Sequence, residues 1–432
     1  LGPHHMPGYG FLTLEFGQRK TGTGLFMYYG RNGGHGHKDR LNIGLYGFGF
    51  DLTPDLGYPE FATSWPQRNE FTDPTISHNT VLVDQVPQSV NWVGHPRFFK
   101  VLPGFQCAEV ESSDVYASTR DYRRTVAMIQ VSDWLGYALD VFRVEGGADH
   151  MRGLHGPGVE VTTSGLKLTA QETGTLAGPD IAFGTTLPVG PKYGYSWLGR
   201  IEYDNLPPDN WTADWKVQAG YRGATGAEDV HVRMWDFTPA DDVVLADGEP
   251  PQNKAGNPRW LRYCLSHRAG EDLTSTFVSL LEPYQGEPII DRAERLPLPG
   301  DPHSGPVALR VYLKSGAVDT LIYSPDGAAV TVDDTTFCQG RLAMVRTRDG
   351  AVETMALIAG TRLQYGDIIL SAPDAGHTGK VVRFDKDTLD DARIWVDADL
   401  PTGETLAGQE IIIENDRARN ACYTIERVER DG

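Results

Sequence analysis

The fold class is clearest in two neighbouring stretches, TVAMIQV at residues 125–131 and YALDVF at residues 137–142. Both are rich in β-branched, aromatic and other apolar residues, and a short segment containing Asp133 and Gly136 separates them. Short runs of this composition, bounded by turn-forming residues, are typical of β-strands. The two stretches therefore predict two strands joined by a turn.

The same pattern extends along most of the chain. It predicts further strands at residues 11–16, 25–29, 277–281 and 308–313, and a loop over residues 247–258. Long windows with an apolar period of 3.6 residues are essentially absent, which argues against a helical fold. The sequence therefore predicts an all-β protein, with too many strands for one small barrel.

The strand pattern changes near Gly360. Beyond it, only short strands are predicted, at residues 379–384, 392–396 and 410–414. We expect a large domain over residues 1–360 and a small C-terminal β-domain over residues 361–432, whose size is near the lower end for a domain.

Composition narrows the classes of function. Of the 432 residues, 40% are hydrophobic and 22% are charged, which is typical of a soluble globular protein. The formal net charge of −19 argues against a general nucleic-acid binder, so a polyanionic ligand would need a local basic cleft. No apolar run is long enough to span a membrane. The four cysteines form no CxxC pair and are predicted to be buried free thiols, with distant disulfides as the alternative: Cys107, Cys264, Cys338 and Cys422.

The stretch GGHGHKD at residues 33–39 is the strongest functional signal. On an extended strand, His35 and His37 would point to the same face, and the flanking glycines allow close backbone approach. With Asp55 and His78, His37 completes an N, O, N ligand set that is typical of zinc and leaves a fourth position open. Asp39 is expected to orient one of the imidazoles. The alternative is that these histidines are satisfied by hydrogen bonds in a turn-rich region.

The order of several motifs resembles the heparinase II/III-like family of polysaccharide lyases. The motifs that carry this resemblance are GGHGHKD at 33–39, DLG at 55–57, SHNTVLVD at 77–84 with Gln88, DVFRV at 140–144 with His150 and His155, and TFVSLLEPY at 276–284. The upstream His-x-His-x-Asp pattern and the His-Asn-Thr segment are the most specific of them.

The resemblance implies a large antiparallel β-sandwich followed by a small C-terminal β-domain. Such lyases also have an N-terminal helical toroid, which we expect to be missing from this chain, since it begins at Leu1 and matches only the β portion. By the same resemblance, His37, Asp55 and His78 bind zinc in a structural role. One minor departure is Asp-Leu-Gly at 55–57, where the family more often has proline or serine in the middle.

The activity implied is β-elimination in a uronic-acid-containing polysaccharide, such as a heparin- or heparan-like, alginate-like, or chondroitin- or hyaluronan-like chain. His35 is the expected catalytic base or acid, and Tyr58 could donate a hydrogen bond or a proton. Arg31 and Arg68 could each grip the substrate carboxylate in a bidentate manner. Asn79 could line the substrate cleft or cap its strand. Each of these residues also has a purely structural interpretation.

Two other classes of function remain open at this stage. One is a non-catalytic carbohydrate-binding or scaffolding β-sandwich with a structural zinc; the other is a metal hydrolase with Asp39 as its base. A lyase should expose His35 in a cleft, whereas a scaffold would bury it. Trp65 and Trp92 are candidates for stacking on sugars, and His150 and His155 are expected to be structural histidines in a loop. The resemblance further implies secretion or a periplasmic location, with an anionic polysaccharide and the toroid domain as partners.

Overall fold

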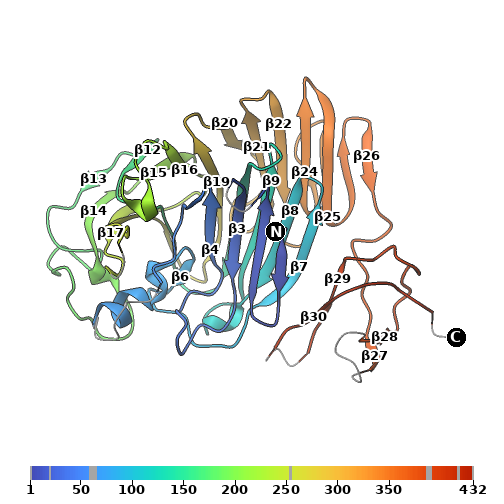
Figure 1. Ribbon diagram of the computed structural model, residues 1–432, viewed down its shortest axis with the longest axis horizontal. Coiled ribbons are helices and arrows are strands. Elements are labelled where there is room, and N and C mark those ends of the chain that lie inside the picture. Colours follow the sequence, from blue (N-terminus) through green and yellow to red (C-terminus); the bar gives the residue numbers. More distant parts are fainter. Residues whose placement is uncertain are drawn as a thin grey trace.

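A computed structural model describes residues 2–18, 21–57, 66–252, 255–385, 392–415 and 419–430. Within these ranges the paired strands are antiparallel, and the helices are single short turns. Figure 1 shows them as stacked and adjoining sheets. The prediction of an all-β antiparallel sandwich is confirmed.

The first two large sheets are the N-terminal sheet and the central sheet. The N-terminal sheet has five strands in the order β1 (His4–Met6), β2 (Phe11–Phe16), β3 (Thr23–Tyr28), β4 (Asn42–Gly47) and β5 (Phe50–Asp51). The central sheet has eight strands in the order β12 (Val161–Ser164), β15 (Trp211–Lys216), β16 (Val230–Asp236), β19 (Thr274–Gln285), β10 (Gly136–Glu145), β9 (Asp121–Gln130), β8 (Phe105–Glu111) and β7 (His95–Leu102).

Two further large sheets complete the sandwich. The lateral sheet has the order β13 (Thr169–Ala170), β14 (Leu198–Asp204), β17 (Asp242–Gly248), β18 (Leu261–Ala269), β11 (Asp149–His155) and β6 (Val81–Val83). The outer sheet has the order β20 (Ile290–Arg295), β21 (Val307–Leu313), β22 (Ala317–Tyr323), β24 (Thr336–Arg348), β25 (Ala351–Tyr365) and β26 (Ile368–Ser371), with β23 (Ala329–Thr331) paired to β24.

The remaining elements are small. The C-terminal strands form two pairs, β27 (Val381–Phe384) with β28 (Ile394–Val396) and β29 (Glu410–Ile413) with β30 (Ala421–Thr424). The short helices are η1 (Arg68–Thr72), η2 (Thr75–Ser77), η3 (Ser113–Val115), η4 (Tyr195–Trp197) and η5 (Tyr221–Gly223). Among the described residues, no helix has the length and apolar character needed to cross a bilayer.

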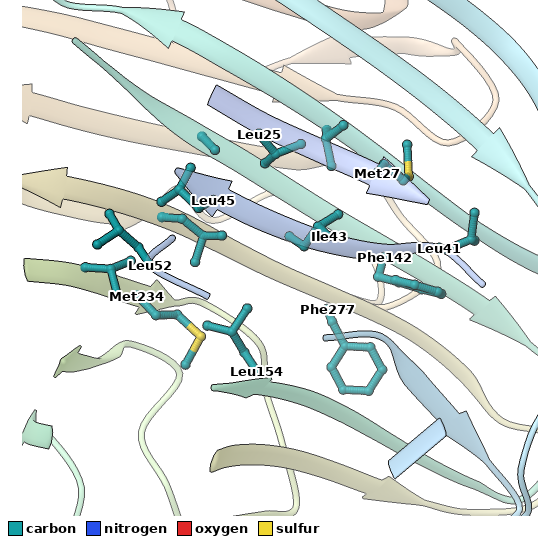
Figure 2. Close-up of a cluster of buried hydrophobic side chains, with 14 of the residues drawn as sticks. Leu25, Met27, Leu41, Ile43, Leu45, Leu52, Phe142, Leu154, Met234 and Phe277 are labelled. Carbon is teal, nitrogen blue, oxygen red and sulfur yellow. The ribbon is translucent and has the colours of Figure 1, made fainter. Parts of the chain in front are cut away.

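The central sheet is the shared middle layer, because both of its faces are buried. One face packs against the N-terminal and lateral sheets, where Leu25 and Ile43 share a core with Phe142 of β10 (Figure 2). The opposite face packs against the outer sheet, where Leu139 and Val141 of the same strand share a second core with strands β21 and β22. Strand β10 is accordingly buried at nearly every position, and its apolar residues do not alternate with exposed polar ones.

The predicted domain boundary at Gly360 lies inside a long strand. Strand β25 runs from Ala351 to Tyr365, and β26 adds to the same sheet up to Ser371. The two small C-terminal strand pairs follow. The later of these pairs lies beside β7 and β1, where the His5 Nδ1 atom is 2.7 Å from the Glu410 carboxylate. The division at 360/361 stays a prediction.

The cysteines are free thiols, as expected. Three of them are buried and Cys422 is partly exposed.

One histidine of the lateral sheet forms ion pairs with both strands that flank its own. Both ring nitrogens of His267 on β18 face carboxylates, with Nδ1 2.8 Å from Asp242 Oδ2 and Nε2 3.1 Å from Asp149 Oδ2. Burial lowers the pKa of His267, but hydrogen bonds with Asp149 and Asp242 outweigh this effect and raise the pKa from 6.5 to about 10. The folded state therefore keeps a proton that the unfolded chain releases.

This shift predicts a specific dependence of stability on pH. The stabilisation by His267 is fully present below pH 6.5 and is lost as the pH rises toward about 10. We expect His267→Gln to lower the free energy of unfolding most at the acidic end of this window and least at its alkaline end. Urea unfolding of both proteins across the window measures this difference, and a difference independent of pH would contradict the assignment.

Candidate active and metal site

The histidine-rich segment forms a turn instead of the expected extended strand. Residues 31–41 contain turns and bends but no strand, so the prediction of a strand through His35 and His37 was wrong. Gly34 adopts a positive φ of 76°, and a Cβ at Gly36 would lie 2.8 Å from the Arg31 carbonyl oxygen. Glycine permits both the left-handed backbone and the close approach. The tight turn therefore explains the glycines better than a strand would.

The turn nevertheless brings both histidines to one cavity. His35 is exposed and His37 is nearly buried, and both line a cavity of about 500 Å³ together with Asp39 and Asp55. Asp55 follows β5, whereas His78 directly follows helix η2. The histidines and Asp55 thus come together from three loops and not from one strand.

Four side chains form a compact cluster at the base of this cavity. One ligand-type atom from each of His37, Asp39, Asp55 and His78 lies within 4.8 Å of the others. His37 Nδ1 is 3.5 Å from Asp55 Oδ1, and His78 Nδ1 is 3.0 Å from Asp55 Oδ2. Two imidazoles and two carboxylates are a donor set that suits zinc. Asp39, which we expected to act only on an imidazole, lies in the cluster itself.

Amide side chains hold the loops of the cluster in place. Asn42 Nδ2 donates to Asp55 Oδ2 at 3.0 Å, and Asn42 Oδ1 accepts the backbone N–H of Asn79. The Asn79 amide donates to the carbonyls of Ile43 and Thr53 and accepts the N–H of His155. Asn79 is buried and serves to join these segments, and a contact with substrate stays a prediction.

The orientation of His78 indicates a cation at this position. Its Nε2 atom lies 3.1 Å from the Thr72 carbonyl oxygen, so we assign the N–H of the neutral ring to Nε2. In this neutral form the lone pair on Nδ1 faces Asp55 Oδ2, whereas in the protonated ring Nδ1–H donates a hydrogen bond to it. Two acceptors at this distance repel each other unless a proton or a metal ion lies between them. In addition, Asp39 Oδ1 is buried without a hydrogen-bond partner. These residues fit a divalent metal.

The pKa values in the cluster reflect this crowding of charge. Burial raises the pKa of the Asp39 carboxyl to about 6, although His78 and His37 act to lower it. Burial acts in the same direction on Asp55, but the charge of His78 and hydrogen bonds from both histidines hold its pKa well below the usual range. Burial lowers the pKa of His78, whereas Asp55 has the larger combined effect and raises it. The site thus concentrates negative charge that a cation would neutralise.

The other predicted site residues differ in where they lie. Tyr58 and Trp65 lie outside the described residues. Arg31 is exposed, and its guanidinium carbon lies 4.8 Å from the centre of the Trp92 ring. Arg68 is partly buried in η1, where its Nη1 atom donates to Asn69 Oδ1 at 3.4 Å. Neither arginine lines the cavity that His35 and His37 share, and their role in substrate binding stays a prediction.

Three further residues of the family-like motifs are buried. Gln88 hydrogen-bonds the backbone N–H and carbonyl of Arg40. His150 and His155 lie on strand β11, so the expectation that they sit in a loop was wrong. Burial lowers the pKa of His155 to about 4, which keeps its imidazole neutral.

Sequence reasoning missed the residue that connects the site to the core. Arg124 on β9 is fully buried and forms a bidentate pair with Asp140 at 2.7 Å for both hydrogen bonds. Its Nη1 atom also donates to the carbonyls of Leu41 and Asn79, which lie in two of the site loops. A charged residue within a predicted buried strand, such as Asp140, was the available signal, because buried charges require partners.

Comparison with known proteins places this arrangement in a family. Residues 8–176 match the family model described as Heparinase II/III-like, C-terminal. This stretch is similar to the Heparinase II/III-like C-terminal domains. The matched range contains His35 and all four residues of the cluster, so the resemblance inferred from the motifs is confirmed.

Solved structures agree with the fold of this heparinase-like domain. A heparinase III gene product aligns with a TM-score of 0.51 and 16% identity, over 75% of this chain and 42% of that protein. At this identity the likeness supports the fold alone. The heparan sulfate lyase HepC from Pedobacter heparinus aligns with a TM-score of 0.44 and 14% identity, over 72% of this chain and 41% of that protein, a score too low to add to the argument. The chain therefore spans about two fifths of the length of these lyases. No curated protein sequence matches it significantly.

The Arg124 contacts predict that the core of the heparinase-like domain depends on the buried ion pairs around Asp140. Asp140→Asn or Arg124→Met leaves an uncompensated charge or unbonded carbonyls, which should cost about 3–5 kcal/mol of unfolding free energy. Urea unfolding gives this difference. The matched control is Arg120→Met, because Arg120 pairs with Asp272 on the surface and its loss should leave the unfolding midpoint unchanged. Equal small effects at both sites would contradict the prediction.

Proposed function

We propose that this chain is the β-sandwich part of a lyase that cleaves a uronic-acid-containing polysaccharide by β-elimination. The observation that carries the proposal is the exposure of His35 in the same cavity as the nearly buried cluster of His37, Asp39, Asp55 and His78. A scaffold with a purely structural metal would have no need to expose a histidine beside that metal site. The family match adds support for a lyase, because its solved neighbours include a heparinase III.

β-Elimination requires a base at one carbon and a proton donor at a neighbouring oxygen. In the proposed reaction, the neutral imidazole of His35 takes the proton from C5 of the uronate. The electron pair of the C5–H bond forms the C4=C5 double bond, and the C4–O bond breaks with its electrons on oxygen. That oxygen then takes up a proton, for which Tyr58 is the proposed donor. Histidine suits proton transfer because both of its forms are populated near neutral pH.

The uronate carboxylate must be neutralised while charge builds up at C5. The cavity itself is lined by carboxylates and histidines, so the proposed cations, Arg31 and Arg68, would have to act from its margin. Arg31 is the better placed by sequence, because it begins the turn that carries His35. The contact of either arginine with the substrate is part of the proposal.

The cluster is proposed to bind zinc. Zinc held by His37, Asp39, Asp55 and His78 would offset the buried negative charge and fasten the three loops that shape the cavity. Its proposed role is structural, since His35 is left to act on the substrate. A polymer-degrading enzyme meets its substrate outside the cytoplasm, so a secreted or periplasmic location is part of the proposal.

The activity is tested by ultraviolet absorbance, which reports the unsaturated uronate that β-elimination creates. We expect absorbance to rise when the complete gene product is incubated with one of a panel of uronic-acid polysaccharides, and to stay flat for its His35→Ala variant. The matched control is His377→Ala, which removes an exposed histidine outside the site and should leave the rate unchanged. Sugar binding without any rise in absorbance would favour the non-catalytic carbohydrate-binding class.

The metal is tested by elemental analysis and thermal unfolding. We expect about one zinc per purified chain and its loss in Asp55→Asn, because this carboxylate faces both histidines. A ligand that binds only the folded state stabilises it by about 2.7 kcal/mol at a hundredfold excess over its Kd, so chelation should lower Tm. The control is Asp291→Asn, whose exposed carboxylate on β20 lies outside the cluster. The proposal would be contradicted if the purified protein contained no metal and its Tm did not change with either zinc or chelator.

A further inference from the structure

One wall of the cavity at His35 is formed by residues that the core does not hold. Met6 and Tyr9 line this cavity, yet Met6 is 46% exposed and Tyr9 is 68% exposed. They belong to β1 and to the turn at residues 7–10 that leads into β2. Strand β1 has three residues and lies at the edge of its sheet. An element with few buried apolar contacts opens at a low free energy, so this wall depends on the groups that fasten it.

The turn at residues 7–10 packs on the start of the turn that carries His35. The Gly10 carbonyl oxygen accepts the N–H of Tyr29 at 2.7 Å. A Cβ on Gly10 would lie 2.3 Å from the Gly30 Cα, so the two backbones are in close contact. Gly30 directly precedes the segment of turns and bends that contains His35. The positions of the two turns are therefore coupled.

A single amide from the C-terminal part of the chain connects two of these segments. Asn420 directly precedes β30, and its Nδ2 atom donates to the carbonyl oxygens of Pro7 at 3.1 Å and of Gly94 at 2.8 Å. Both partners are acceptors, which orients the NH₂ group toward them. Gly94 in turn donates its N–H to the Tyr29 carbonyl oxygen at 2.6 Å. Asn420 thus fastens the turn at residues 7–10 to the strand end beside it.

A second link passes through His5 of β1. Its Nδ1 atom lies 2.7 Å from both carboxylate oxygens of Glu410 on β29, and its Nε2 atom lies 2.5 Å from the Tyr29 hydroxyl oxygen. The imidazole also stacks on the Phe99 ring of β7, with centroids 4.9 Å apart. The side chain of His5 is only 2% exposed, and hydrogen bonds shielded from water are electrostatically stronger than exposed ones. Strand β29 is thereby connected to the residue that precedes Gly30.

The strands that provide these two links add little to the core. We call β29 and β30 the last strand pair; none of their residues is buried. Among the described residues that line the cavity at His35, none comes from the last strand pair. Its contacts with the rest of the protein include those to the segments behind Met6 and Tyr9. The pair therefore acts on the cavity through the position of other residues.

We propose that the last strand pair positions the wall of the candidate active site, with Asn420 and Glu410 as the positioning residues. The inference rests on the proposed function, in which the wall formed by Met6 and Tyr9 faces the substrate beside His35. It adds a role in the reaction for a part of the chain beyond the family match at residues 8–176. A fixed wall limits the positions of the substrate relative to His35, and a misplacement of about 1 Å can cost roughly a hundredfold in rate.

The kinetic test uses the complete gene product with alginate, hyaluronan, heparosan and heparan sulfate in the absorbance assay. Asn420→Leu removes both donated hydrogen bonds, and Glu410→Leu removes the acceptor for His5. We expect each variant to lower kcat/KM about tenfold on the polymer that the wild type cleaves, because the wall is loosened. Tm should stay unchanged, since neither residue is part of the core. Glu410→Gln keeps an acceptor oxygen for His5 and should retain most of the activity.

The matched control lies at the end of the same strand. Glu414→Gln removes an exposed carboxylate whose partner is Arg97 of β7, 3.6 Å away, and it touches neither His5 nor the turn at residues 7–10. Exposed ion pairs of this kind contribute little, so kcat/KM should not change.

Amide hydrogen exchange shows where each substitution acts. In Asn420→Leu we expect faster exchange in peptides that cover residues 4–12 and 28–36, and unchanged exchange in β9 and β10. A merely structural role would instead lower Tm and speed exchange throughout the sandwich. The position of the faster exchange therefore distinguishes positioning from general stability.

The outcomes separate this inference from the proposed function. An active wild type whose kcat/KM is unchanged in both leucine variants overturns the positioning role and leaves the lyase intact, whether or not local exchange is faster. A lower Tm with faster exchange throughout assigns the last strand pair to stability and also overturns the role. If the wild type cleaves none of the four polymers, the proposed function and this inference fall together.

Discussion

The buried guanidinium of Arg124 is the contact on which the site depends most directly. It forms a bidentate pair with Asp140 across two strands of the central sheet. It also donates hydrogen bonds to the backbone carbonyls of Leu41 and Asn79, which strand pairing leaves unbonded. An ion removed from water needs all of its donors satisfied. The geometry of these two loops is therefore coupled to the ion pair in the core.

That coupling continues on the other side of Asp140. Arg152 of β11 donates to Asp140 and also to Asp236 of β16, so one buried network connects the central and lateral sheets. The same strand β11 ends at His155, whose backbone N–H is held by Asn79. Hence the cluster of His37, Asp39, Asp55 and His78, the loops around it and the two sheets beneath it are joined by hydrogen bonds. Such a surround is what a preorganised site requires.

The charge distribution bears on how an acidic protein could bind the proposed anionic substrate. The chain carries a net charge of −19, and the cavity has two carboxylates in contact with two imidazoles. A metal in the cluster would cancel this local charge without involving the substrate.

The sequence by itself determined which segments form strands and which types of side chain make up the site. Short apolar runs such as 125–131 and 137–142 became strands β9 and β10, and His37, Asp55 and His78 came together. These features depend on local composition and on residue type, which the sequence states directly. The strand expected through His35 was wrong, because the glycines serve a tight turn that only its contacts with Arg31 reveal.

The tertiary structure alone decided which segments meet. Sequence spacing carries no information about the direction in which a loop folds back, so Asp39 was not expected as a fourth member of the cluster. The same holds for Arg124, whose partners are separated from it by 16 to 83 positions. The outward face of the N-terminal sheet could not be predicted for a related reason: Phe11 and Phe26 look like ordinary strand residues until the register shows that they face away from the core. Packing of distant segments, and not local preference, settled these features.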